Sequence, residues 1–157
     1  MPYDVAQICE NGHLITACLH KHPEQNSKFC SRCGAPTINA CPHCHQNIKG
    51  ASTGSYSYLS PYTVPAYCEY CGTPFPWTEA AIQNAALLVQ EDEELSEELK
   101  SSIVESLPDI IAETPASNLA TVRVKKGLSI AGKFTADAIR QFVIDFGCEF
   151  AKKSLRL

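Results

Sequence analysis

The sequence predicts a small α+β protein, in which short β-hairpins at the N-terminus precede a C-terminal α-helical region of three to four helices. Residues 1–77 hold eight of the nine cysteines, all five histidines and eight of the ten prolines, whereas residues 78–157 show helical periodicity. A cysteine- and proline-rich part with few aliphatic side chains cannot bury a large core and needs cross-links. We therefore expect two domains, 1–77 and 78–157.

The composition is that of a folded chain without a membrane span. Of the 157 residues, 45% are hydrophobic and 19% are charged, so a core can form. No apolar run reaches the roughly 18–20 residues that a transmembrane segment needs, and Met1–Ile8 lacks the features of a secretory signal. We expect a cytoplasmic location, where thiols stay reduced and paired cysteines bind metal rather than form disulfides.

An internal repeat lies in the N-terminal part. Residues 29–36 (FCSRCGAP) and 67–74 (YCEYCGTP) share the pattern aromatic, Cys, two residues, Cys, Gly, one residue, Pro. Two cysteines at this spacing form a tight turn that directs both sulfur atoms at one metal ion. Glycine after the second cysteine permits the positive φ that closes such a turn. The repeat therefore predicts two metal-binding turns of the same kind.

Each copy of the repeat closes its own set of four ligand candidates. A close pair, a strand-length loop and a second close pair are the layout of a zinc ribbon. The sequence thus predicts a tandem (double) zinc ribbon, with site one in residues 1–37 and site two in residues 38–77. The ligands of site one are Cys9, His13, Cys30 and Cys33, and those of site two are Cys41, Cys44, Cys68 and Cys71.

Zinc is the expected metal at both sites, because thiolates and imidazole suit its tetrahedral preference. Four protein ligands leave no open position, which predicts two structural Zn²⁺ ions. Iron competes at the all-cysteine site, and a RING-like arrangement would mix the ligand pairs. Cys18, His20 or His22 could replace His13 at site one. We prefer His13 because Asn11-Gly12 predicts a turn that folds it back beside Cys9.

Capping signals divide the second part into helices. We expect one helix over 79–90 capped by Thr78, a second from Ser96 to about Pro108, a third from Thr114-Pro115 to a stop at Gly127, and a last one capped by Thr135. The last helix presents an apolar face that includes Phe142, Phe146 and Phe150. Because four short helices offer little area to cover that face, self-association through it is a reasonable hypothesis.

The charge distribution separates the candidate functions. Residues 1–77 carry four basic and four acidic side chains, so a dominant phosphate-contact contribution is missing. The loop between Cys44 and Cys68 nevertheless carries Tyr56 and Tyr58, which would share one strand face and stack on bases. In the helical part, residues 79–113 carry ten acids and one base, and residues 120–157 carry eight bases and three acids.

These features favour a zinc-binding, non-enzymatic interaction or adaptor protein. The ribbons would be structural, and the helical tail would dock a protein partner or a second copy of the chain. Nucleic-acid binding through Tyr56, Tyr58 and the basic last third is the alternative. An enzyme would need a polar pocket with perturbed acids, which the sequence does not reveal.

The chain also resembles a known bacterial family. The run CENGH at 9–13, the runs FCSRCGAP and ACPHC within 29–44, and YCEYCGTP followed by Pro76-Trp77 resemble a double zinc ribbon. More narrowly, they resemble the family catalogued as domain of unknown function 2321. The resemblance implies a small bacterial cytoplasmic protein with an N-terminal double zinc ribbon, and it places the predicted ligands at the family's positions. It implies no activity, because the family has none assigned.

Overall fold

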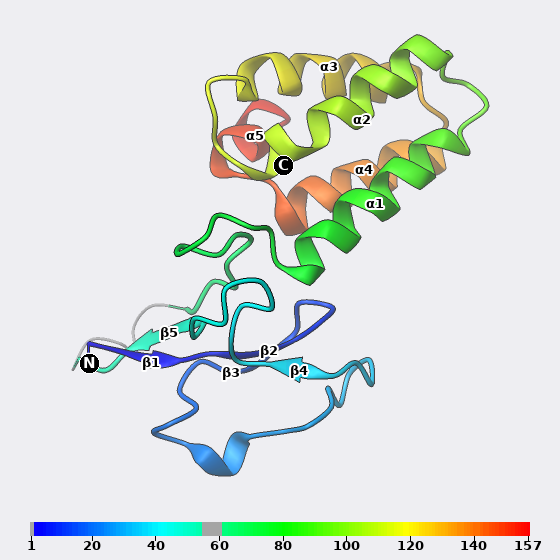
Figure 1. The fold of residues 1–157 in the computed structure, drawn as a ribbon. Coiled ribbons are helices and arrows are strands. Elements are labelled where there is room, and N and C mark those ends of the chain that lie inside the picture. Colours follow the sequence, from blue (N-terminus) through cyan, green and yellow to red (C-terminus); the bar gives the residue numbers. More distant parts are fainter. Residues whose placement is uncertain (1, 55–60) are drawn as a thin grey trace. The chain divides into compact units, whose positions relative to one another are not determined.

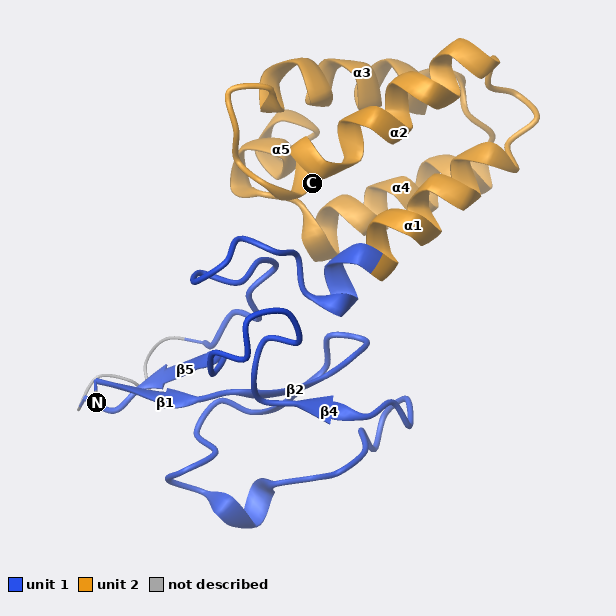
Figure 2. Ribbon diagram, in the orientation of Figure 1, with its two compact units in different colours: residues 1–79 blue, residues 80–157 orange. Residues whose placement is uncertain are grey.

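The chain folds as two units, residues 1–79 and 80–157 (Figure 2). The computed structural model describes residues 2–54 and 61–157. Short strands and cysteine-bearing turns build the first unit, and helices build the second (Figure 1). This arrangement confirms the predicted small α+β class.

In the described residues of the first unit, five short strands form two antiparallel sheets. One sheet pairs β1 with β5, and the other has the order β3-β2-β4. A single 3₁₀ turn, Pro23–Gln25, lies between β3 and β4. The strands are β1 (Tyr3–Val5), β2 (Gln7–Cys9), β3 (Leu14–Thr16), β4 (Thr37–Ile38) and β5 (Lys49–Ser52). Strands this short provide few ladder hydrogen bonds, so the turns between them must be held by other contacts.

The core of the first unit is small and includes cysteine side chains. Its aliphatic members are buried on β1, β2 and the segments that follow β3 and β4: Val5, Ala6, Ile8, Leu19 and Ile48. Four cysteines are buried with them: Cys9, Cys30, Cys41 and Cys68. A core with so few aliphatic groups cannot offset the entropy of ordering the unit without cross-links.

Gly50 is the position at which β5 passes closest to neighbouring backbone. A Cβ atom built there would lie 2.8 Å from the carbonyl carbon of Val5 and 2.9 Å from that of Asp4. Because backbone atoms cannot move aside as a side-chain tip can, we expect Gly50→Ala to destabilise the first unit by about 2 kcal/mol. Gly54→Ala is the matched control, since among the described residues its Cβ would meet only Ser52 Oγ, at 3.6 Å. Denaturant titration followed by Trp77 fluorescence measures both, and equal stabilities would contradict the prediction.

Five helices build most of the second unit, one more than the upper limit of the prediction. They are α1 (Pro76–Gln90), α2 (Glu97–Ile111), α3 (Ser117–Ile130), α4 (Lys133–Phe146) and α5 (Glu149–Ser154). The predicted last helix is in fact two helices. Gly147 has extended backbone angles, and its N–H bonds to Val143 O, which ends α4 and lets the chain turn into α5.

Two predicted helix stops are wrong, and packing explains both. Pro108 lies on the exposed side of α2, and the helix continues to Ile111 because Ile110 and Ile111 are buried in the core. Gly127 lies inside α3, where a Cβ atom would approach Ile103 Cγ1 at 2.8 Å. Its missing side chain allows α2 and α3 to pack closely, so the glycine serves the helix contact rather than a helix end.

Three predicted helix starts also differ. The third helix begins at Ser117 rather than at Pro115, and its N-cap is Ala116 rather than Thr114. Thr135 lies within α4, which begins at Lys133. The first helix begins at Pro76, a residue suited to the first helical position. Thr78 does not cap it, because its hydroxyl donates to Ala66 O at 2.8 Å. Through Trp77 and Thr78 the first turn of α1 therefore belongs to the first unit, which extends to residue 79.

The predicted apolar face of the last helix forms part of the core of the second unit. Ile139 and Val143 are 2% and 0% exposed, and Phe142 stacks on Phe146 with ring centroids 5.8 Å apart. Phe146 and Phe150 are half-buried, so most but not all of the face on which the self-association hypothesis depended is covered within the unit. Among the described residues, no helix has the length and apolar character needed to cross a membrane.

Candidate metal centre

Three turns of the first unit share one backbone conformation. In residues 29–36 and 67–74 the N–H of the first cysteine bonds to the carbonyl five residues later, and the glycine N–H bonds back to the carbonyl of that cysteine at 2.8 Å. The residues at the two ends of each turn form an isolated antiparallel bridge. Residues 40–47 adopt the same pattern, with Cys41 N–H to Gln46 O at 2.8 Å and His45 N–H to Cys41 O at 2.9 Å. We call these three segments the cysteine turns.

The cysteine turn of residues 40–47 has the same conformation as the other two, although its sequence does not match the repeat. Gly34 and Gly72 close their turns with φ of 75° and 73°, whereas His45 occupies the same place with φ of 63°. The sequence signal was hidden because histidine replaces the glycine and Asn47 replaces the proline. The spacing of Cys41 and Cys44 alone carried the prediction.

We expect His45→Gly to stabilise the first unit by about 1 kcal/mol, because glycine adopts positive φ without the steric cost that a Cβ atom imposes. His43→Gly in the same turn is the control. Its φ is not positive, so the added flexibility of glycine should lower stability instead. The midpoint of denaturant unfolding distinguishes the two variants, and a His45→Gly protein no more stable than the parent would contradict the reading.

Site one gathers residues from β2, from the turn after it and from the first cysteine turn. The ligand atoms of Cys9, His13, Cys30 and Cys33 all lie within 4.8 Å of one another. Cys9 Sγ is 3.7 Å from Cys33 Sγ, and His13 Nδ1 is 3.5 Å from Cys9 Sγ and 3.6 Å from Cys30 Sγ. His13 is folded back by the hydrogen bond from Cys9 N–H to His13 O at 3.0 Å.

Site two is built from the other two cysteine turns. The sulfur atoms of Cys41, Cys44, Cys68 and Cys71 also lie within 4.8 Å of one another. Cys41 Sγ is 3.8 Å from Cys71 Sγ, and Cys44 Sγ is 3.6 Å from Cys68 Sγ. Each site thus takes its ligands from one half of the unit, in chain order, and the pairs do not alternate between sites.

These distances fit a tetrahedral ion of the size of zinc. With metal–sulfur bonds of about 2.3 Å and metal–nitrogen bonds of about 2.0–2.1 Å, two sulfur ligands lie about 3.8 Å apart, and sulfur and nitrogen about 3.6 Å. The sulfur–sulfur distances of 3.6–3.8 Å agree with this geometry and are far longer than the about 2.0 Å of a disulfide. Each site could therefore hold one metal ion with four protein ligands.

Hydrogen-bond donors around the clusters favour the thiolate form of the outermost ligands. The backbone N–H of Ala35 and the side chain of Asn11, 3.3 Å away, lower the pKa of Cys33 to about 6. The side chain and backbone of Thr73 lower the pKa of Cys71 to about 6 in the same way. Burial, by contrast, raises the pKa of Cys9. The donors thus stabilise negative charge on Cys33 and Cys71, as metal-bound thiolates require, whereas burial and the neighbouring thiols raise the pKa of Cys44 to about 12.

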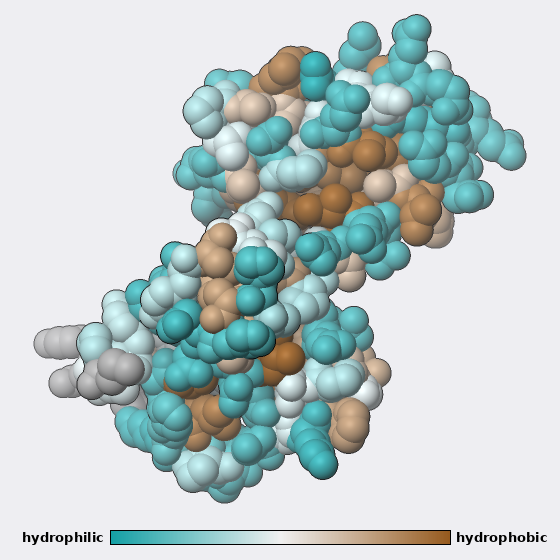
Figure 3. All heavy atoms as spheres, in the orientation of Figure 1, coloured by the Kyte–Doolittle hydropathy of each residue, from teal (hydrophilic) through white to brown (hydrophobic). Residues whose placement is uncertain are grey.

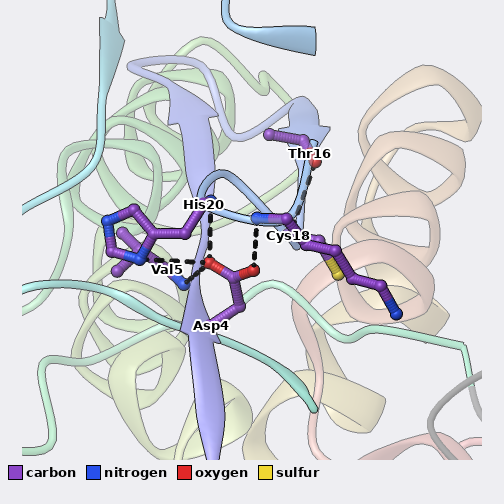
Figure 4. A network of polar contacts seen from close by, with 6 residues as sticks. Asp4, Val5, Thr16, Cys18 and His20 are labelled. Carbon is purple, nitrogen blue, oxygen red and sulfur yellow. Dashed lines mark hydrogen bonds and ion pairs between the residues drawn. The ribbon is translucent and has the colours of Figure 1, made fainter. Parts of the chain in front are cut away.

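The alternative ligands at site one lie outside the cluster. Cys18 N–H donates to Thr16 Oγ1 at 3.1 Å, and His20 Nδ1 lies 3.5 Å from Asp4 Oδ1 (Figure 4). Asp4 is buried, and burial alone would raise its pKa. The backbone N–H groups of His20, Val5 and Lys21 outweigh that effect and hold the pKa of Asp4 below its usual value. This carboxylate therefore fixes the loop that carries Cys18 and His20.

His22 also has another partner, since its Nδ1 lies 3.1 Å from Glu24 Oε1. The two tyrosines predicted to stack on bases, Tyr56 and Tyr58, lie outside the described residues.

Trp77, the one tryptophan of the chain, joins site one to the segment after site two, a contact that the sequence did not suggest. A Cβ atom on Gly12, which lies between two ligands of site one, would sit 2.9 Å from Trp77 Cβ. The indole is 3% exposed, stacks on Phe75 at 4.7 Å and donates from Nε1 to Pro65 O at 2.9 Å. Its fluorescence should therefore report the folding of the first unit.

The fold and the paired four-ligand clusters define a double zinc ribbon protein with a helical C-terminal unit. The chain belongs to the bacterial family described as an uncharacterised protein conserved in bacteria, domain of unknown function 2321, whose model matches residues 2–155. This match confirms the resemblance noted from the cysteine-bearing runs. Comparison with curated proteins and with solved structures found no match.

Proposed function

We propose that the protein is a non-enzymatic adaptor in which two structural zinc ions hold the first unit in shape and the helical unit docks a partner. The observation that carries this proposal is the closed donor set of each cluster. Three thiolates with one imidazole, and four thiolates, fill all the positions of a tetrahedral ion. A metal so enclosed has no place for substrate or activated water.

Zinc is the proposed metal at both sites, and metal analysis of the purified chain tests it. Zinc has no d–d absorption, whereas iron bound by four thiolates absorbs visible light. We expect two zinc ions per chain and a colourless protein. A coloured protein that contains iron would assign site two to iron instead. The thiols also require a reducing compartment, which supports a cytoplasmic location as part of the proposal.

The ionisable groups outside the clusters support a non-catalytic function. Two buried aspartates in the described chain have lowered pKa values, and both are held by hydrogen bonds that leave them structural. Asp4 accepts three backbone N–H bonds. Asp92 accepts three more and is also bonded by the Thr135 side chain. Burial raises the pKa of Tyr62 to about 12, so this phenol stays neutral. None of the three is poised to transfer a proton near neutral pH.

Docking by the helical unit is tested by affinity capture with the metal-loaded chain and a surface variant. Val122 is 64% exposed on α3, so Val122→Asp should leave the helices intact while changing the surface. We expect a bound protein that the parent chain retains and the variant loses. If both chains capture nothing and the parent stays monomeric, the adaptor function is wrong.

Nucleic-acid binding is the second candidate, and one feature of the first cysteine turn favours it. Phe29 is 57% exposed, with Lys28 before it and Arg32 three residues after it. An exposed ring beside two cations is a stacking platform for single strands. Binding to a single-stranded oligonucleotide that weakens with salt, and that Phe29→Ala reduces, would support it. Absence of binding at low salt would exclude it.

A further inference from the structure

Two neighbouring helices of the second unit carry opposite charges on their outer faces. Glu98 and Glu105 lie one above the other on the exposed side of α2, and Lys125 and Lys126 are exposed on α3. An open groove runs between the two helices and is lined by Glu97, Glu98, Ser101, Ser102, Glu105 and Arg123. Because Arg123 of α3 lines the same groove as residues 97–105 of α2, these two parts of the helices lie side by side. Acidic and basic faces thus lie side by side on one surface.

The opposite charges of these two outer faces are not joined in ion pairs in the described part of the chain. Each ion pair of the second unit in the described residues joins side chains three apart on one helix: Lys100 with Glu97, Arg140 with Asp137 and Lys152 with Glu149. No ion pair within 4.0 Å links α2 to α3 in this part of the structure, although the two helices are direct neighbours. The surface therefore keeps one acidic and one basic face available to a partner.

The basic face is also apolar. Leu119, Val122 and Ile130 are 52%, 64% and 44% exposed, and their spacing of three and then eight residues places them on one face of α3. Lys126 lies on the same face, four residues from both Val122 and Ile130, so its aliphatic stem can extend this stripe. Apolar side chains are visible at the surface of the helical unit in Figure 3. An exposed apolar stripe bordered by charge is typical of a protein contact.

We propose that a second copy of this chain covers the surface formed by α2 and α3, as a two-fold dimer with its axis parallel to these helices. This inference deepens the proposed docking function by naming the partner and the surface. Rotation about such an axis places α2 of one copy over α3 of the other, so each acidic face meets a basic face. The rotation also leaves the position of each residue along the helix axis unchanged. Because Gly127 of α3 packs on Ile103 of α2, Lys126 is level with Glu105. Glu105 then lies opposite the partner copy's Lys126, and the pair occurs twice.

The charge pattern favours this occupant over an anionic surface. Glu98 and Glu105 would repel lipid headgroups or nucleic acid brought to the same face, whereas a second copy presents both charges in the complementary order. Two outer helix faces bury a small area, so the dimer is weak and depends on protein concentration and salt.

Analytical ultracentrifugation of the full metal-loaded chain tests the dimer, at low and high salt and up to roughly 100 µM protein. We expect dimer at low salt and monomer in high salt. Glu105→Lys or Lys126→Glu alone should raise the dissociation constant at least about tenfold, because like charges then meet twice. The double variant that exchanges the two charges should restore the dimer. Circular dichroism shows that each variant keeps its helices.

Lys153→Glu on α5 is the matched control, since this exposed lysine lies on another helix and changes the net charge equally. It should leave the dimer unchanged. A chain that stays monomeric at low salt, or a double variant that does not recover, would overturn the proposed interface. A monomer that still captures a Val122-dependent partner would retain the adaptor function with a different protein on this surface. If the chain dimerises but captures no Val122-dependent partner, the proposed interface stands and docking of a different protein on this surface is wrong.

Discussion

Replacing Cys68 by serine is expected to lower the metal content from two ions per chain to one and to unfold much of the first unit. Cys68 is a buried ligand of site two, and its removal leaves three sulfur donors. Structural zinc contributes about 10–16 kcal/mol in small zinc-finger peptides, as much as the whole stability of an ordinary domain. The few aliphatic side chains of this unit cannot replace that contribution.

Two probes separate the units in this experiment. Trp77 is buried in the first unit, so its fluorescence should shift toward that of exposed indole, while far-UV circular dichroism should retain most of the helical signal. Cys18→Ser is the control, because Cys18 is a free thiol outside both clusters. It should keep two ions and the parent's fluorescence. A Cys68→Ser chain with two ions, or one with unchanged Trp77 emission, would show that site two does not hold the unit together.

The second large effect is expected at Asp92, which ties the α1–α2 connection to the start of α4. Its carboxylate is 7% exposed and accepts the N–H groups of Glu94, Leu95 and Gly132 at 2.8, 3.0 and 3.1 Å. Replacement by alanine leaves these donors and the Thr135 hydroxyl without their acceptor. We expect Asp92→Ala to destabilise the second unit by about 2–4 kcal/mol, measured by urea unfolding at 222 nm.

Glu93→Ala is the control, because this neighbouring acid is exposed and no hydrogen bond or ion pair within the described chain is shown for it. The pH dependence gives a further readout. Hydrogen bonding, first from the Thr135 side chain, holds the pKa of Asp92 below its usual value despite burial. Its stabilising effect is therefore complete above about pH 4 and is lost as pH falls through the lowered pKa. The difference between the parent and Asp92→Asn should shrink in acid, and a constant difference would contradict this role.

The two clusters illustrate how far spacing alone can lead. Two cysteines separated by two residues form a local turn whose geometry depends little on the rest of the chain, so Cys30 with Cys33 and Cys68 with Cys71 could be paired from the sequence. His13 was supported by the Asn11-Gly12 turn beside it. The conformation of His45 was hidden, because positive φ in a non-glycine residue is imposed by the surrounding hydrogen bonds.

The helix boundaries show the opposite case. Proline and glycine usually end helices, so Pro108 and Gly127 predict helix ends from the sequence. In both places long-range packing decided the outcome, because Ile110 is buried beyond Pro108 and Gly127 packs against Ile103 of α2. The local surroundings of Thr135 predict a helix cap, but its hydroxyl bonds to Asp92, 43 residues earlier in the chain. A local pattern carries no information about such a contact.

By itself, the sequence determined the α+β class, the cysteine turns and the presence of a helical second part, since each depends on residues that are close together in the chain. Only the tertiary structure placed Trp77 against Gly12, moved the Phe-rich face into a core and set an acidic α2 beside a basic, apolar α3. These features require segments that are distant in the sequence to meet. Which segments meet is decided by the burial of apolar surface, and this driving force does not depend on how far apart they lie in the chain.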